Sequence, residues 1–122
     1  MKLTPTEHQQ QCLIFEWAEL NKNRYPELNL MFAIPNGSHK SITQAVKFKR
    51  EGLKSGVPDI FLPHAVTPFH GLFIELKTQG GKLNQNQKDW ILNLKSQGYF
   101  ATVCIGATAA ISTIQNYLKG GV

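Results

Sequence analysis

Hydrophobic residues recur with two different periods along the chain. Spacings of three and four residues, typical of helices, run through residues 7–20, more weakly through residues 38–51, and again through residues 84–98 and 107–118. Short apolar or alternating runs, typical of strands, occupy residues 28–34, 57–62, 71–77 and 99–105. The predicted order is helix, strand, short helix, strand, strand, helix, strand, helix. It favours a mixed α/β sheet with helices on its faces.

Local signals predict where these elements begin and end. Thr4 is a candidate cap for the first helix, with Pro5 near the first helical position. Gly52 ends the second helix, and Asn84 caps the third. The short segment 64–70 predicts a hairpin-type connection between the second and third strands. Phe69 in this connection either covers the core or contacts a second copy of the chain.

The length and composition predict one domain spanning residues 1–122. With 42% hydrophobic residues, the chain can bury a core without a disulfide or metal staple. Cys12 and Cys104 lie far apart in apolar surroundings, which predicts two small core residues in a reducing compartment. Neither a signal peptide nor a run of about 20 apolar residues is visible, so we expect a soluble cytoplasmic protein.

The formal net charge of +5 is concentrated in one segment. Between residues 38 and 57 there is one acidic residue, Glu51, against five basic ones, Lys40, Lys47, Lys49, Arg50 and Lys54. Such a cluster is typical of a surface that contacts phosphates, although mildly basic domains and solvated helix faces are common.

The candidate chemistry lies on the second and third predicted strands. Strand alternation puts Glu75 and Lys77 on one face, whereas Ile74 and Leu76 turn to the opposite, buried face. If the two strands pair, Asp59 comes to lie beside Glu75. Converging carboxylates repel one another unless a cation lies between them, and oxygen ligands suit magnesium or manganese. Each fragment alone is also typical of a turn or a solvated cross-strand pair, but their combination favours a metal site.

These residues resemble a known nuclease signature, PD-(D/E)XK, and the surrounding sequence is similar to the VRR-NUC (virus-type replication–repair nuclease) family. The resemblance extends from residue 7 to residue 117. It rests on Pro35-Asn36-Gly37, on Gly52-x-x-x-Gly56-Val57-Pro58-Asp59, on Gly71-Leu72-Phe73-Ile74-Glu75-Leu76-Lys77, on Gly81-Lys82-Leu83-Asn84-x-x-Gln87-x-x-Trp90 and on Gly98-Tyr99. It implies the restriction-endonuclease-like fold, with a mixed central sheet flanked by helices, and Mg²⁺ or Mn²⁺ as cofactor.

The resemblance also implies roles for individual residues. Asp59 and Glu75 match the metal-binding carboxylates, and the backbone carbonyl of Leu76 is expected to face the metal. Lys77 matches the lysine that positions or activates the attacking water and offsets negative charge at the phosphate.

For Gln87 and Glu7, the role that the resemblance implies stands beside a purely structural explanation. Gln87 matches a glutamine found near such sites, but it can equally be a solvated helix position. Glu7 lies where the family often carries another acidic residue that reaches the metal, but the helix dipole also favours an acid in a first helical turn.

The resemblance implies an endonuclease that acts on branched DNA, including four-way junctions, in a bacterial or phage-infected cell. Symmetric cleavage of a junction calls for two active sites, so a homodimer is expected. The basic segment would bind DNA, together with Asn36 and Lys82 in loops near the strands. The alternatives are a nuclease of the same fold that acts on flap, duplex or single-stranded ends, and a DNA-binding module without activity.

Overall fold

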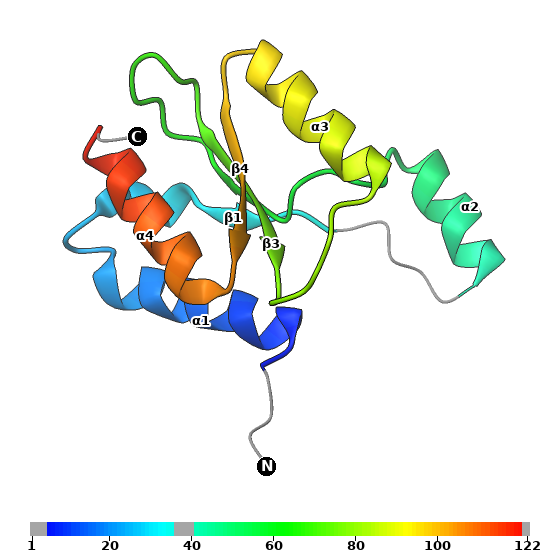
Figure 1. Cartoon of the computed structure of the whole chain (residues 1–122), viewed down its shortest axis with the longest axis horizontal. Helices are drawn as coiled ribbons and strands as arrows, with labels where there is room; N and C mark the ends of the chain where they lie inside the picture. Colours follow the sequence, from blue (N-terminus) through cyan, green and yellow to red (C-terminus); the bar gives the residue numbers. More distant parts are fainter. Residues whose placement is uncertain (1–4, 36–40, 121–122) are drawn as a thin grey trace.

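Four strands form one mixed sheet in a computed structural model that describes residues 5–35 and 41–120. The strands are β1 (Phe32–Ala33), β2 (Ile60–Leu62), β3 (Leu72–Lys77) and β4 (Phe100–Ile105), and they lie in this order across the sheet. The helices are α1 (Glu7–Asn21), α2 (Ile42–Arg50), α3 (Gln85–Ser96) and α4 (Ala107–Leu118), with a 3₁₀ helix, η1 (Pro26–Leu30), before β1 (Figure 1). This architecture confirms the predicted fold class.

The pairing of the strands confirms the predicted hairpin. β1 pairs with β2, and β2 with β3, in antiparallel fashion, whereas β3 and β4 are parallel. In the β2–β3 ladder Ile60 lies opposite Ile74, and Leu62 lies opposite Leu72. Because side chains alternate along a strand, this register decides which residues share a face of the sheet.

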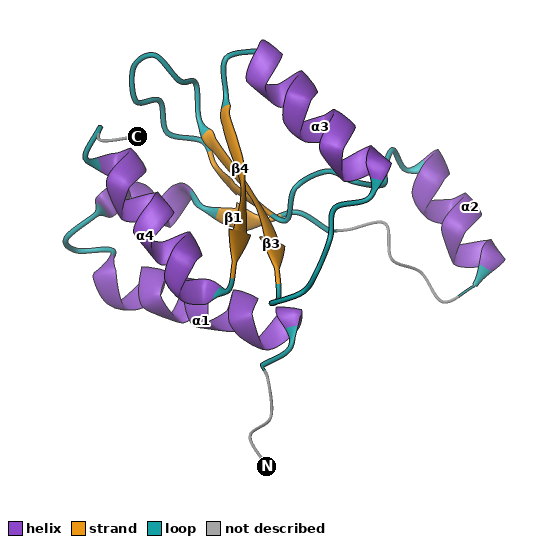
Figure 2. Ribbon diagram, viewed as in Figure 1, coloured by secondary structure: helices purple, strands orange, loops and turns teal. Residues whose placement is uncertain are grey.

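The two faces of the sheet are covered by different helices (Figure 2). The larger core lies against α1 and α4, and it contains Ile60, Ile74, Leu76 and Ile114. The other face packs against α3 through a smaller core of Phe73, Ile91 and Ala101. Leu76 is therefore buried away from α3, as predicted. Phe69 packs against the larger core and forms an edge-on pair with Phe100 at 5.2 Å between ring centroids.

The first helix begins later than predicted. Thr6 caps α1: its side chain accepts from the backbone N–H of Gln9, and the Gln9 side chain accepts from the N–H of Thr6. This reciprocal pair satisfies two backbone donors at the helix start, which explains why Thr6 is preferred. Thr4 lies outside the described residues. Asn84 caps α3 as predicted, and α4 spans residues 107–118 as predicted.

The predicted strand over residues 28–34 is largely wrong. Residues 26–30 form η1 instead, with Pro26 at its first position and the Asn29 side chain donating to the Pro26 carbonyl. Proline fixes the backbone angle required at a helix start, which explains the local preference. Only Phe32 and Ala33 remain in the strand, because only they pair with β2.

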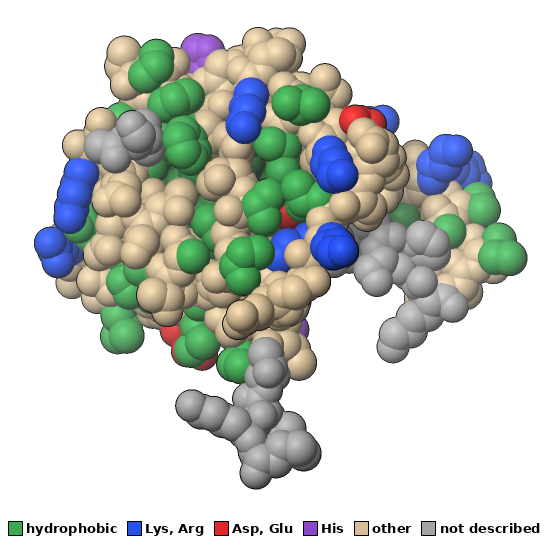
Figure 3. Space-filling model, viewed as in Figure 1, with side chains coloured by type: hydrophobic (Ala, Val, Ile, Leu, Met, Phe, Trp, Pro, Cys, Tyr) green, Lys and Arg blue, Asp and Glu red, His purple; other side chains and the backbone are tan. Residues whose placement is uncertain are grey.

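The predicted burial of Cys12 is wrong, and α2 lies on the surface. α2 buries none of its residues: Ile42 is 83% exposed and Val46 53%. The helix lies beyond the N-terminal end of α3 (Figure 1), and basic side chains gather at its C-terminal end (Figure 3). Cys12 is exposed because it lies on the outer side of α1, whereas Cys104 is buried as predicted. Among the described residues, no helix is long and apolar enough to cross a membrane.

Candidate active site

Three carboxylates meet at one end of the sheet. Oxygen atoms of Glu7, Asp59 and Glu75 all lie within 4.8 Å of one another. Glu7 is the first residue of α1, Asp59 immediately precedes β2, and Glu75 lies in β3. Asp59 is 7% exposed and Glu75 is 2% exposed, so two of the three groups are buried in the fold.

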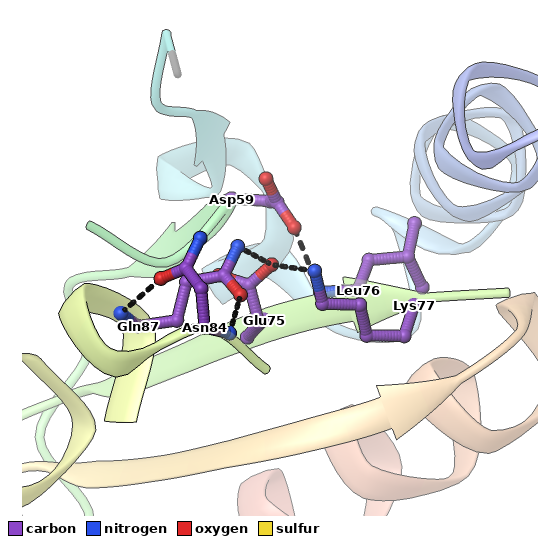
Figure 4. A network of polar contacts seen from close by, with 6 residues as sticks. All are labelled: Asp59, Glu75, Leu76, Lys77, Asn84 and Gln87. Atoms are coloured by element: carbon purple, nitrogen blue, oxygen red, sulfur yellow. Dashed lines mark hydrogen bonds and ion pairs between the residues drawn. The ribbon is translucent and has the colours of Figure 1, made fainter. Parts of the chain in front are cut away.

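The β2–β3 ladder explains the meeting of Asp59 and Glu75. Extending the register of Ile60 opposite Ile74 by one residue puts Asp59 opposite Glu75, as predicted. The Asp59 carboxylate accepts a hydrogen bond of 2.8 Å from the backbone N–H of Leu76 (Figure 4). The Asp59 carbonyl accepts a second bond, of 2.7 Å, from the N–H of Ile34. Asp59 is thus held on both sides, by its backbone and by its side chain.

Glu7 reaches the cluster through a contact between the two ends of the chain. The Gln10 side chain accepts a hydrogen bond of 2.7 Å from the backbone N–H of Ala107, which starts α4. This contact docks the first turn of α1 beside the carboxyl end of β3, where the N–H of Gly106 donates to the carbonyl of Lys77. Glu7 therefore lies among the carboxylates as well as in a first helical turn.

The site lacks enough positive charge to balance its carboxylates. The Lys77 ammonium lies 3.8 Å from the Glu75 carboxylate, and its side chain is 14% exposed. Burial, as the largest cause, and the neighbouring Asp59 carboxylate together raise the pKa of Glu75 from 4.5 to about 8, although Lys77 opposes the shift. Burial and Asp59 also raise the pKa of Glu7. Without a further cation, Glu75 therefore holds a proton near neutral pH.

Gln87 joins the start of α3 to this cluster. Its side-chain oxygen accepts a hydrogen bond of 3.0 Å from the N–H of Asn84, and its amide nitrogen donates to Glu75 at 3.4 Å. The Asn84 side chain in turn accepts from the N–H of Gln87. The capping pair thus fixes which end of the Gln87 amide faces the carboxylate.

The residues present fit a hard divalent cation. All three charged donors are carboxylate oxygens, which magnesium and manganese prefer. Repulsion and burial disfavour the ionised state of Glu75, and a cation would favour it. The arrangement therefore provides an anionic pocket for a cation with an ammonium group at its edge.

The predicted DNA-binding residues lie around α2 and before α3. Lys47, Lys49 and Arg50 form the last turns of α2, and all are exposed. Lys54 follows in the next loop, and Lys82 lies in the loop before α3. Asn36 and Lys40 lie outside the described residues.

One residue near the cluster was not expected from the sequence. Gln11 lines a hollow of about 650 Å³ together with Asp59, Phe48 and Leu53. It lies one helical turn beyond Glu7, so the spacing of four residues was the available signal.

The fold and the site together define a nuclease domain of the PD-(D/E)XK type. The family model of the VRR-NUC domain matches residues 2–108. A solved structure named "VRR_NUC domain protein" superposes with a TM-score of 0.83 at 34% sequence identity, covering 98% of this chain and 93% of that one. The chain therefore belongs to the VRR-NUC family of nucleases, whose substrate is DNA. A comparison with curated proteins gave no match.

Proposed function

We propose that this chain is a magnesium- or manganese-dependent endodeoxyribonuclease that cuts branched DNA. The observation that carries the proposal is the cluster of Glu7, Asp59 and Glu75 beside Lys77. A protein that only binds DNA gains nothing from carboxylates that repel the phosphates. The same carboxylates are useful when a cation must be held against a phosphate.

Asp59, Glu75 and Glu7 would hold the cation, together with the backbone carbonyl of Leu76. When bound, a divalent cation supplies Lewis acidity at the scissile phosphate and makes a bound water more acidic. Asp59 is oriented for this task by the N–H of Leu76, and Glu75 is oriented by the amide of Gln87. These contacts fix the ligands before substrate arrives, which lowers the cost of reorganisation.

Lys77 would act on the phosphate rather than on the cation. Its ammonium lies next to Glu75, at the edge of the carboxylate cluster. There it offsets negative charge that develops on the phosphate, and it can orient the attacking water.

The exposed basic residues of α2 would bind the DNA backbone. Phe48 of α2 lines the same hollow as Asp59, so phosphates bound by Lys47, Lys49 and Arg50 would lie on the side of the cluster that this hollow opens. Lys54 and Lys82, with Asn36 and Lys40, would extend this surface. Contacts of this kind give affinity without sequence preference.

Four-way junctions are the proposed substrate, and a homodimer is the proposed assembly. A junction has two equivalent strands to cut, so two active sites related by a two-fold axis match its symmetry. We expect each copy to supply one complete carboxylate cluster. In this proposal residues 1–122 act as one nuclease domain.

A cleavage assay with matched DNA substrates tests the proposal. A labelled four-way junction, a flap, a linear duplex and a single strand of the same sequence are incubated with the protein and Mn²⁺. We expect paired nicks in the junction and slower cleavage of the others, with a dimer mass in light scattering. If the flap or the ends of the duplex are cut faster than the junction, the junction is not the preferred substrate, and the faster-cut DNA takes its place. No cleavage of any substrate would overturn the nuclease proposal.

A further inference from the structure

A trench runs from α3 to the carboxylate cluster. Its outer part is a hollow of about 670 Å³ between α2 and α3, lined by Phe48, Lys49, Lys54, Trp90 and Asn93. A hollow of about 340 Å³ continues from it and is lined by Trp90 and Leu53. The inner part is the hollow of about 650 Å³ that reaches Asp59. Leu53 lines all three, so we call them together the α2–α3 trench.

Two aromatic side chains line the trench without belonging to the cores. The other tryptophan of the chain, Trp17, packs against the larger core, and its ring centroid lies 6.3 Å from that of Tyr25. Trp90 and Phe48, in contrast, are not among the described side chains that build or flank either core. Both are half-buried, and Trp90 lines the outer and the middle hollow. α3 is anchored instead by Ile91, so its packing does not require an indole at position 90.

The polar groups of the outer hollow suit a nucleotide. Lys49 and Lys54 contribute two positive charges, and Asp89 contributes one negative charge. The Asp89 carboxylate already accepts a hydrogen bond of 2.8 Å from the Gln85 side chain. The amides of Asn86 and Asn93 supply donors and acceptors for a base edge. Aromatic faces together with lysines are the combination that binds single strands, through stacking and phosphate contacts.

The loop that forms one wall of the trench is fixed to α3. Gly56 has φ of +93°, and a Cβ there would lie 2.7 Å from atoms of Asn86. The Asn86 side chain also donates to Ser55 at 3.4 Å. Since Asp59 follows three residues after Gly56, the wall of the trench and the carboxylate cluster share one anchored segment. The distance between a bound base and the cluster is therefore set by the fold.

We propose that the α2–α3 trench binds an unpaired nucleotide of the substrate, with its base stacked on Trp90. The proposal rests on the proposed nuclease function and adds a specificity determinant to it. At about 670 Å³, the outer hollow lies within the range of about 300–1,000 Å³ typical of small-ligand pockets, which suits a single nucleotide rather than a duplex. Occupancy requires a base that is free of pairing, as at a branch point or a strand end.

Fluorescence of Trp90 tests the proposal without cleavage. In the variant Trp17→Phe, Trp90 is the remaining tryptophan of the chain. The full chain is titrated in EDTA with an oligothymidine strand and with a blunt duplex, and binding is followed independently by anisotropy of a label on the DNA. We expect the single strand to quench the emission as it binds, and the blunt duplex to bind with little quenching. Equal quenching by both DNAs, unchanged emission on binding of the single strand, or no binding of the single strand at low salt would overturn the proposal.

Substitution at the same position gives the second measurement. Trp90→Ala should weaken single-strand binding by about 5- to 150-fold, the range expected for loss of one stacked base, and duplex binding by less than twofold. Trp90→Phe should restore most of the affinity, since a smaller ring still stacks. Leu92→Ala removes an exposed side chain of the same helix and should have no effect. If Trp90→Ala does not fold, the single-strand affinity of Trp90→Phe and the quenching of Trp90 by the single strand still test the stacking proposal. If the single strand quenches Trp90 selectively but the protein cuts no DNA, the nuclease proposal is contradicted, whereas the binding of an unpaired nucleotide in the trench is supported.

Discussion

The Asp59 carboxylate accepts a hydrogen bond of 2.8 Å from the backbone N–H of Leu76. This bond links the segment before β2 to the end of β3, and it orients one oxygen of the Asp59 carboxylate. Asparagine can accept the same bond through its amide oxygen. A substitution of Asp59 by asparagine therefore separates the charge of this residue from its place in the fold.

The first prediction concerns pH and the cation. Because the pKa of Glu75 is about 8 in the folded protein and 4.5 is its ordinary value, the folded state binds more protons than the unfolded state between these limits. The cation-free protein should therefore lose stability as pH rises from about 5 to 8. A loss of about 1 kcal/mol lowers Tm by about 4 °C for a domain of this size, which thermal melts in EDTA will measure.

Binding of the cation should show the opposite trend. The cation must displace the proton from Glu75 when it binds. The apparent affinity of the protein for the cation should therefore rise with pH, by up to about tenfold per pH unit, until pH 8 is reached. Calorimetry in two buffers of different ionisation enthalpy measures this proton release. Glu75→Gln should reduce this loss of stability and leave the smaller contribution of Glu7, whose pKa is also raised. A loss as large as that of the wild type would contradict the assignment.

A second prediction separates the two contacts of Gln87. Gln87→Glu keeps the oxygen that accepts from Asn84, but it places an anionic oxygen next to Glu75 instead of an amide donor. At pH 6 the stability should change by less than about 0.5 kcal/mol, since glutamate serves equally well in a capping pair. Cleavage should fall by at least about tenfold, or about 1.4 kcal/mol of transition-state stabilisation. Asn84→Asp preserves the cap and Gln87, so it should cleave like the wild type. If Gln87→Glu cleaves DNA at the wild-type rate, the contact of Gln87 with Glu75 is not needed for cleavage, and Gln87 serves only to cap α3.

A third prediction concerns the basic surface of α2. Replacing Lys49 and Arg50 together by alanine should weaken binding to all DNA, on the order of tenfold at moderate salt. It should also reduce the slope of log affinity against log salt by about 2, or about 0.9 per lost phosphate contact. Lys22 and Lys119 lie at the C-terminal ends of α1 and α4, on the opposite side of the molecule from α2 (Figure 1). Their double alanine variant loses the same charge and should leave the slope unchanged. Equal slopes for both double variants would contradict a DNA surface on α2.

A fourth prediction compares two glycines with the same backbone angle. Gly52 and Gly56 both have φ of +93°, but a Cβ at Gly52 would meet no atom within 4 Å, whereas one at Gly56 would overlap Asn86. Gly52→Ala should cost about 1 kcal/mol for the left-handed conformation alone. Gly56→Ala should cost at least about 1 kcal/mol more and should also reduce cleavage, because the overlap displaces the segment that carries Asp59. Denaturant unfolding measures both, and equal costs would show that the contact with Asn86 is not tight.

The part of the site that lies on paired strands could be predicted from sequence. Alternation along residues 71–77 separates Glu75 and Lys77 from Ile74 and Leu76, and pairing of the two strands brings Asp59 beside Glu75. These are local consequences of strand geometry. The cap at Asn84 was equally local.

The remainder depends on contacts between distant segments. Glu7 joins the cluster because Gln10 binds the N–H of Ala107, 97 residues away in the sequence. The apolar residues of α1 do not show which of them is buried: Ile14 is, whereas Leu20 is 84% exposed. Thr6 and Gln9 have the spacing of a capping pair, which is a local signal that favours Thr6 over Thr4 as the cap.

Cleavage of a labelled four-way junction at increasing Mn²⁺ concentration, by the wild type and by Asp59→Asn, tests the central claim most directly. Glu16→Gln, which removes one negative charge from an exposed position of α1, is the matched control. We predict cation-dependent cleavage by the wild type and by the control. Asp59→Asn should cleave at least about 100-fold more slowly at saturating cation, yet bind the junction in EDTA at least as tightly as the wild type. Cleavage by Asp59→Asn at the wild-type rate, or cleavage by the wild type in excess EDTA, would contradict the account.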